Sequence, residues 1–200
     1  MKESNRFLTT LFVALLAASS LPGCATGPIL VDGRLQFPEY KFSVDSPSTE
    51  WRMIESKPPG AVVAWINTVT KSRIVITASK AHPDVSLRTV VEAFKAGMTS
   101  KGIPDDLARK FPGSEGFRGT FTVTIEEEKE INLDGKMFHR VILNYGVVPV
   151  KGISVSGKMI FYFFKGEEFI FSLFFNAVLG YYDKDLVVLE QMVRGLRVPM

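Results

Sequence analysis

The chain has few of the residues that build metal centres and disulfide frameworks. Its 200 residues include one Cys and two His. A single Cys excludes an intramolecular disulfide framework, and so few ligands make a Cys/His zinc cluster unexpected. No run of five like charges occurs, and the net charge at pH 7 is only +3. That charge is too weak for the basic surface of a nucleic-acid-binding protein, so no nucleic-acid partner is expected.

Apolar residues are present in ordinary abundance. They make up 46% of the chain and include 16 Phe, which is enough for a hydrophobic core. Extended disorder is therefore excluded for the chain as a whole. The length favours one domain, because domains usually contain about 100–200 residues.

The N-terminus is apolar but too short to span a membrane. Lys2 and Arg6 precede an apolar run at residues 7–20, whereas a membrane-spanning helix needs roughly 20 such residues. A cationic start followed by a short apolar run is typical of a secretory signal peptide. We therefore exclude residues 1–23 from the predicted fold.

The residues that follow this run, Leu21-Pro22-Gly23-Cys24, resemble the lipobox of bacterial lipoproteins. Leu21, Gly23 and Cys24 match that motif, and Pro22 departs from it. The resemblance implies cleavage before Cys24, acylation of its thiol, and a lipid anchor in a bacterial membrane. Ala25 after the cysteine implies sorting to the outer membrane, facing the periplasm. The alternatives are an ordinary secretory peptide with an incidental cysteine, or an uncleaved anchor.

Residues 24–36 are predicted to be the lipidated cysteine and a flexible tether. Gly27, Pro28 and Gly33 in this segment disfavour regular structure. Removal of the signal peptide leaves a net charge of about +2, which again disfavours a nucleic-acid partner. A single α+β domain is then predicted over residues 37–200.

The first half of this domain reads as short strands followed by a helix. Residues 61–67 and 73–78 are rich in Val, Ile and Trp and predict a hairpin. Ser86 is a predicted N-cap for a helix over residues 87–101, whose apolar residues fall on one stripe. Shorter strands are predicted at residues 40–44 and 51–54.

Long strands are predicted at residues 121–131 and 137–147, joined by Asp134-Gly135, a strong hairpin signal. A three-residue loop would set Glu128 opposite Arg140, which avoids a like-charge pair of Lys129 with Arg140. Strand alternation would then direct Glu126, Glu128 and Glu130 to one face and Glu127 to the other. Without a calcium-loop motif, this run is interpreted as a solvated strand face.

A second long hairpin is predicted from residues 153–164 and 168–178. Its phenylalanines occupy both odd and even positions of the strands. They therefore point to both faces of this part of the sheet, and both faces should be buried. A last helix is predicted over residues 183–194. The predicted architecture is an antiparallel β-sheet covered by helices on both faces, an α/β/α sandwich.

Three stretches resemble the PsbP-like fold. They are Tyr40-Lys41-Phe42-Ser43-Val44-Asp45-Ser46-Pro47 followed by Trp51, the helix after His82-Pro83-Asp84, and the ending Val193-Arg194-Gly195-Leu196-Arg197-Val198. That fold occurs in an extrinsic photosystem II subunit, in bacterial lipoproteins of the DcrB type and in a Ran-binding nuclear-import factor. The resemblance spans residues 37–198 and implies a non-enzymatic accessory or assembly protein. It supplies no ligand-binding residues.

Near-matches to catalytic motifs fail on context. Residues 152–158 match the start of a P-loop, but Met159 stands where Ser or Thr should bind Mg²⁺, and Lys158 begins a strand rather than a helix. A nucleophile elbow fails because Ser156 replaces its second glycine. His139 is interpreted as a buried, hydrogen-bonded strand residue, and His82 is the better candidate for a cleft residue.

The sequence therefore predicts a membrane-anchored envelope lipoprotein that acts as a non-enzymatic binding or assembly module for an unidentified protein partner. No metal and no cofactor are expected apart from the acyl chains on Cys24. The alternative is a periplasmic carrier of an apolar ligand in a Phe-lined cavity. A third option is a hydrolase that uses His82 or His139 without a recognisable motif.

Overall fold

The computed structural model describes residues 27–55, 60–82, 84–99, 119–149 and 154–198. Leu21, Gly23 and Cys24 lie outside these residues. The elements in chain order are β1 (Ile29–Val31), β2 (Arg34–Phe37), η1 (Pro38–Tyr40), β3 (Phe42–Asp45), β4 (Trp51–Met53), β5 (Ala61–Asn67), β6 (Arg73–Lys80), α2 (Leu87–Thr99), β7 (Gly119–Leu133), β8 (Lys136–Pro149), β9 (Val155–Lys165), β10 (Phe169–Val178), η2 (Leu179–Tyr181) and α4 (Tyr182–Gly195).

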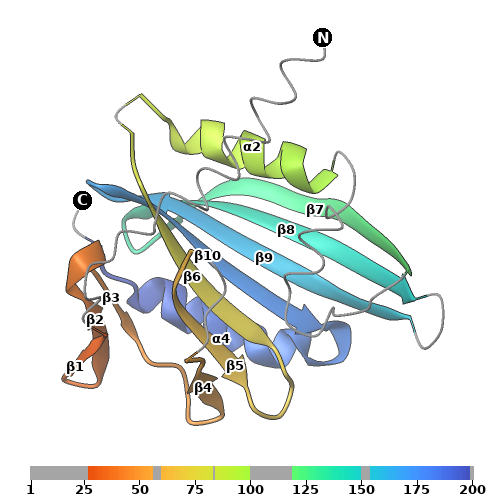
Figure 1. Ribbon diagram of the computed structural model, residues 1–200, viewed down its shortest axis with the longest axis horizontal. Helices are drawn as coiled ribbons and strands as arrows, with labels where there is room; N and C mark the ends of the chain where they lie inside the picture. The colour runs from red at the N-terminus through yellow and green to blue at the C-terminus, as the bar shows by residue number, and fades with distance from the viewer. Residues whose placement is uncertain (1–26, 56–59, 83, 100–118, 150–153, 199–200) are drawn as a thin grey trace.

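A seven-stranded antiparallel sheet forms the body of the domain (Figure 1), with strand order β4-β5-β6-β10-β9-β8-β7. The three predicted hairpins are confirmed, as β5–β6, β7–β8 and β9–β10. The sequence did not predict that β10 also pairs with β6, which joins the two halves of the chain into one sheet.

The β7–β8 hairpin differs from the predicted register. Leu133 pairs with Lys136, so the loop has two residues, and Lys129 rather than Glu128 stands opposite Arg140. Asp134 and Gly135 both have positive φ, 52° and 82°. Two such residues in succession make the tight turn whose twist matches that of the flanking strands. The turn geometry therefore outweighs the like-charge pair.

Residues 29–36 are not a flexible tether. β1, β2 and β3 form a separate three-stranded antiparallel sheet, and Leu35 and Phe37 of β2 are buried in the core. Asp32 and Gly33, with φ of 51° and 76°, make the β1–β2 turn. The described domain thus begins at β1, because the alternation of β2 buries its apolar side chains.

Helix α2 packs on one face of the large sheet. Ser86 caps it as predicted, since the Thr89 backbone N–H donates to Ser86 Oγ at 3.1 Å. Two buried residues of the helix, Val91 and Phe94, meet the strand side chains of this face. The buried cluster consists of Val91, Phe94, Val141, Leu143, Met159 and Phe163.

The other face is covered by α4 together with the small sheet (Figure 1). Leu189, Met192 and Val193 of α4 and Phe42 and Val44 of β3 belong to the same core cluster. The described residues contain two α-helices, and a sheet shares the covering of this face. The fold is therefore mostly antiparallel sheet, and the prediction that helices cover both faces is not confirmed. No helix among the described residues is long and apolar enough to cross a membrane.

Candidate functional site

The residues predicted to carry function are not brought together. The side chain of His82 is 70% exposed, and its Nδ1 lies 3.5 Å from Asp84 Oδ2. His82 lines neither of the two pockets described below. His139 is buried, and its Nε2 lies 3.0 Å from Glu128 Oε1. The interpretation of His139 as a buried, hydrogen-bonded strand residue is confirmed.

The strand phenylalanines pack against one another. The rings of Phe164 and Phe171 are stacked with centroids 4.9 Å apart, and on the α2 face Phe161 lies 4.4 Å from Phe94. Phe161 and Phe164 line neither of the two concave surfaces described below, and Phe169 and Phe171 line only the smaller one, with a volume of about 10 Å³. In this part of the chain the rings fill the core, and the structure does not support the predicted Phe-lined ligand cavity.

In the P-loop-like stretch, residues 155–158 belong to strand β9, as their context predicted. Lys158 lies within β9, and Gly157 is buried where a side chain would overlap the Ala177 carbonyl oxygen and the Tyr145 ring. Gly157 thus serves close packing between strands, not phosphate binding.

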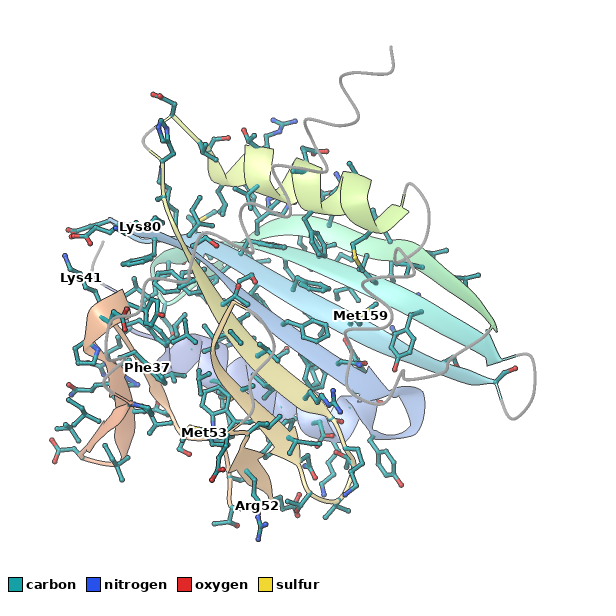
Figure 2. All side chains as sticks on the ribbon, viewed as in Figure 1. Phe37, Lys41, Arg52, Met53, Lys80 and Met159 are labelled. Atoms are coloured by element: carbon teal, nitrogen blue, oxygen red, sulfur yellow. The ribbon has the colours of Figure 1, made fainter. Side chains whose placement is uncertain are left out.

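A wide concave surface in the described residues is formed by both ends of the domain. It is a groove of about 450 Å³, which we call the terminal groove. It is open to solvent, and Figure 2 marks its position by Phe37 and Lys41. Its lining comes from β2, η1, β3 and the segment after α4: Gln36, Phe37, Pro38, Lys41, Phe42, Ser43, Arg197 and Val198.

Backbone geometry fixes the shape of the terminal groove. Ser43 and Arg197 exchange two backbone hydrogen bonds of 2.9 Å each, which tie β3 to the C-terminal segment. Lys41 has a φ of 53° and donates its N–H to the Pro38 carbonyl oxygen, which closes η1. The sequence contains no motif for this arrangement, because residues about 150 positions apart form it.

The groove combines apolar rings with cations. Phe37 and Phe42 are stacked with centroids 4.5 Å apart; both rings are largely buried in the core, and their edges form the apolar floor of the groove. Arg197 is exposed, and in the described part of the chain its guanidinium has no ion-pair partner. Lys41 is exposed as well, and the hydrogen bond from its ammonium to Glu168 raises its pKa. An apolar segment carrying a carboxylate would complement these groups.

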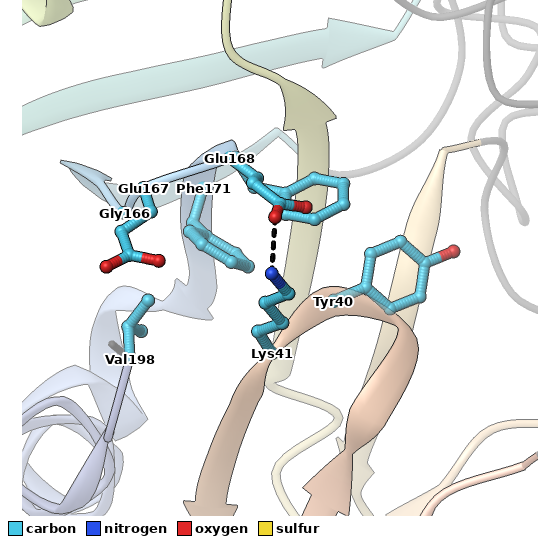
Figure 3. Close-up of a pocket in the computed structure, with 8 residues that line it drawn as sticks. Tyr40, Lys41, Gly166, Glu167, Glu168, Phe171 and Val198 are labelled. Carbon is cyan, nitrogen blue, oxygen red and sulfur yellow. Dashed lines mark hydrogen bonds and ion pairs between the residues drawn. The ribbon is translucent and has the colours of Figure 1, made fainter. Parts of the chain in front are cut away.

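A small cavity adjoins the groove through Lys41 and Val198. Its volume is about 10 Å³, room for about one water molecule. Figure 3 shows Lys41 reaching Glu168 across its mouth, with Phe171 and Val198 at its wall. This cavity is too small for an apolar cargo.

Three glutamates of β7, Glu126, Glu127 and Glu128, form ion pairs on the two faces of the sheet. A β-bulge between Ile125 and Glu127 leaves Glu126 outside the paired register of β7 and β8. The bulge turns Glu126 to the face of Glu127, where it meets Lys158 Nζ at 2.7 Å. The prediction that Glu126 and Glu127 point to opposite faces is therefore wrong, because an extra residue shifts the alternation.

The opposite face carries a second set of charges. Glu128 Oε2 lies 2.7 Å from Lys95 Nζ of α2, while Glu128 Oε1 contacts His139. The hydrogen bond from Lys95 lowers the pKa of Glu128. Among the described residues no group of three or more His, Asp and Glu side chains is placed to hold a metal ion. The Glu128 carboxylate thus links α2 to the sheet.

A buried acid was missed by the sequence reasoning. Asp185, in the first turn of α4, is 1% exposed. Its carboxylate accepts from Thr70 Oγ1 at 2.6 Å and from Asn67 Nδ2 at 3.3 Å. These bonds join α4 to the β5–β6 turn, so the contact is structural.

No family model matches the chain, and no curated protein matches it. Among solved structures, the cyanobacterial PsbP protein (CyanoP) of Synechocystis sp. PCC 6803 superimposes with a TM-score of 0.53. The match covers 89% of this chain and 98% of that protein, at 13% identity. The fold is PsbP-like. The resemblance seen in the sequence is thereby confirmed at the level of fold.

Two other solved structures superimpose with lower TM-scores. LpqN of Mycobacterium tuberculosis, described as involved in cell envelope biogenesis, gives a TM-score of 0.46 at 12% identity over 80% of this chain and 84% of LpqN. The Ran-binding protein Mog1p of Saccharomyces cerevisiae gives 0.46 at 11% identity over 85% of this chain and 96% of that protein.

Proposed function

We propose that the protein is a lipid-anchored envelope protein whose PsbP-like domain is a non-enzymatic binding or assembly module. In this proposal Cys24 is acylated, and the domain is held at the periplasmic side of the outer membrane. The terminal groove then receives a protein segment that carries an acidic side chain. The partner is a protein, and no nucleic acid, metal or cofactor is required.

The terminal groove is the observation that carries this proposal. It combines stacked apolar rings with an exposed Arg197 whose guanidinium lacks an ion-pair partner in the described residues. Aromatic and arginine side chains are the residues that most often dominate binding energy at protein interfaces. An open groove of about 450 Å³ suits a peptide segment better than an enclosed cargo.

The lipid anchor rests on the lipobox match at Leu21, Gly23 and Cys24. Two or more acyl chains on one cysteine give stable membrane association, whereas one chain does not. Processing is tested with globomycin, which blocks cleavage at lipoboxes. Accumulation of a longer precursor is expected. An unchanged mass would contradict the anchor.

Partner binding is tested by mild crosslinking in intact cells and quantitative co-purification from solubilised envelopes. We compare the wild type with Arg197→Glu, and with Arg52→Glu as the matched control on an exposed arginine of β4. A partner that the wild type and Arg52→Glu recover, and that Arg197→Glu loses by about tenfold, supports the groove. Equal recovery by all three proteins contradicts its role.

The same preparation discriminates the carrier alternative. Native mass spectrometry of protein purified from membranes would show a lipid-sized adduct beyond the acyl chains on Cys24 if the protein were a carrier. We expect no such adduct, because the phenylalanine rings of the described core occupy the space that a cargo would need. A stoichiometric adduct would contradict the proposed binding module.

A further inference from the structure

The first strand of the domain is apolar and exposed along its whole length. Ile29, Leu30 and Val31 are 49%, 66% and 39% exposed. Consecutive strand residues point to opposite faces, so exposure of all three means that neither face of β1 rests on the core. Three exposed apolar residues in succession form a patch of the kind that marks interaction sites.

The position of β1 makes it an edge of the small sheet. Among the described strands β1 pairs only with β2, in the order β1-β2-β3. Leu30 stands opposite Leu35, which is buried in the core. Leu30 therefore continues the apolar face of Leu35 beyond the body of the domain (Figure 1, where β1 lies at the lower left).

Natural edge strands are usually protected by charges, proline or a bulge. β1 contains none of these, since its sequence is Ile-Leu-Val. The nearest acid, Asp32, is at the tip of the turn. The cation of β2, Arg34, is already paired with Asp45 at 2.8 Å. Nothing charged in β1 opposes its burial against an apolar phase.

The distance along the chain to the proposed anchor is short. Ile29 is five positions after Cys24, and a fully extended chain covers at most about 18 Å over five steps. An acylated Cys24 would therefore hold β1 close to the lipid surface. A second copy of the chain or a partner strand could pair with the same edge, but neither is tied to it by the covalent chain.

We infer that β1 is a membrane-contacting edge, in which Ile29, Leu30 and Val31 insert into the interfacial layer of the bilayer that holds the anchor. This inference rests on the proposed lipid anchor at Cys24. The expected depth is the headgroup region, because the free backbone groups of an edge strand need water or headgroup partners and are not tolerated in hydrocarbon.

Contact at β1 would also orient the domain. A lipid anchor alone leaves a domain free to rotate above the membrane, whereas a second contact fixes one face towards it. Ile29 pairs with Gln36, which lines the terminal groove. The groove would thus lie beside the membrane surface, and a partner segment reaching it would come from a protein that is also close to the membrane.

The test uses the full mature lipoprotein, carrying Leu30→Cys labelled with an environment-sensitive fluorophore and reconstituted in vesicles of phosphatidylethanolamine and phosphatidylglycerol. The matched control is Val69→Cys at the β5–β6 turn, since Val69 is 65% exposed and Leu30 is 66% exposed. Cys24 is the only natural cysteine, so its acylation leaves one labelling site in each variant.

We expect quenching by nitroxide-labelled lipids to be about threefold stronger at position 30 than at position 69. Equal quenching at both positions overturns the inference. A probe at position 30 that is shielded from aqueous iodide but not reached by the lipid quencher also overturns it, because a protein surface then covers β1.

Failure of the anchor has a different signature. Two labels per chain and no retention on vesicles would show that Cys24 carries no acyl chains, which contradicts the proposed function and removes the basis of the inference. One label per chain with firm vesicle retention but equal quenching leaves the anchor intact and overturns only the contact at β1.

Discussion

Lys129 and Arg140 stand directly opposite each other in the β7–β8 hairpin, and the carboxylate of Glu127 bridges them. Glu127 Oε2 lies 2.8 Å from Lys129 Nζ, and Glu127 Oε1 lies 2.6 Å from Arg140 Nη2. A like-charge cross-strand pair is unfavourable by itself. Here one acid two residues along the strand compensates both cations, so the tight Asp134-Gly135 turn is tolerated.

Replacing Glu127 should leave the repulsion between Lys129 and Arg140 uncompensated. We expect Glu127→Gln to lower the free energy of unfolding by about 1 kcal/mol, because Lys129 and Arg140 lose their shared counter-charge. Urea denaturation at pH 7 measures the change. Glu130→Gln on the same strand is the control, since no ion pair of Glu130 is seen in the described residues, and an equal loss in both variants would contradict the bridge.

The same bridge predicts a pH dependence. The hydrogen bond from Lys129 lowers the pKa of Glu127 below its ordinary value of 4.5. A carboxyl group with a lowered pKa in the folded state stabilises the fold above that ordinary value, and this contribution is lost as the pH falls through the lowered pKa. The difference in stability between wild type and Glu127→Gln should therefore shrink in acid. A difference that is constant from pH 7 to acid would be inconsistent with this account.

Gly157 should not tolerate a side chain. A Cβ at this position would overlap the Ala177 carbonyl oxygen and the Tyr145 ring, so Gly157→Ala should destabilise the fold by about 1–3 kcal/mol. Thermal denaturation measures it. Gly180→Ala is the control, because nothing lies within 4 Å of a Cβ built there. An unchanged stability of Gly157→Ala would contradict this account, because it would show that the strands can move apart without loss of free energy.

The buried Asn67 organises the β5–β6 turn. Its Oδ1 accepts from the Val69 and Thr70 backbone N–H groups at 2.8 Å and 3.0 Å, and its Nδ2 reaches Asp185. We expect Asn67→Ala to cost about 2–3 kcal/mol, because two N–H groups and a buried carboxylate lose a partner. Thr68→Ala, at an exposed position of the turn, should cost about 0.5 kcal/mol or less. Similar urea midpoints for both variants would contradict this role.

Tyr182 should ionise at a higher pH than an ordinary tyrosine. Burial, assisted by the nearby charge of Glu126, raises its pKa from 10.0 to about 12. A raised tyrosine pKa means that the folded state favours the neutral phenol, so this group's contribution is complete below pH 10 and is lost as the pH rises towards 12. Absorbance titration at 295 nm should show a component near pH 12 that Tyr182→Phe removes and Tyr181→Phe retains. Its retention in Tyr182→Phe would assign the component to another tyrosine.

Local pattern predicted the hairpins and both helices, because alternation, turn residues and caps act over a few neighbouring positions. Ser86 caps α2 as its position predicted, and the two-sided phenylalanine pattern of β9 and β10 corresponds to burial on both faces. The resemblance at residues 40–47 and 193–198 indicated the fold. Leu21, Gly23 and Cys24 remain predictions, since they lie outside the described residues.

Tertiary structure decided what depends on partners distant in the chain. β10 pairs with β6, Asp185 is buried by the β5–β6 turn, and Ser43 meets Arg197 to form the terminal groove. The sequence pattern did not reveal the bulge at Glu126 either. One extra residue in a strand moves the residues that follow it to the opposite face. The sequence predicted a tether where β1 lies, since the pairing of β1 depends on β2 and β3. Sequence periodicity indicates which side chains are buried, whereas only the folded chain determines which elements cover them.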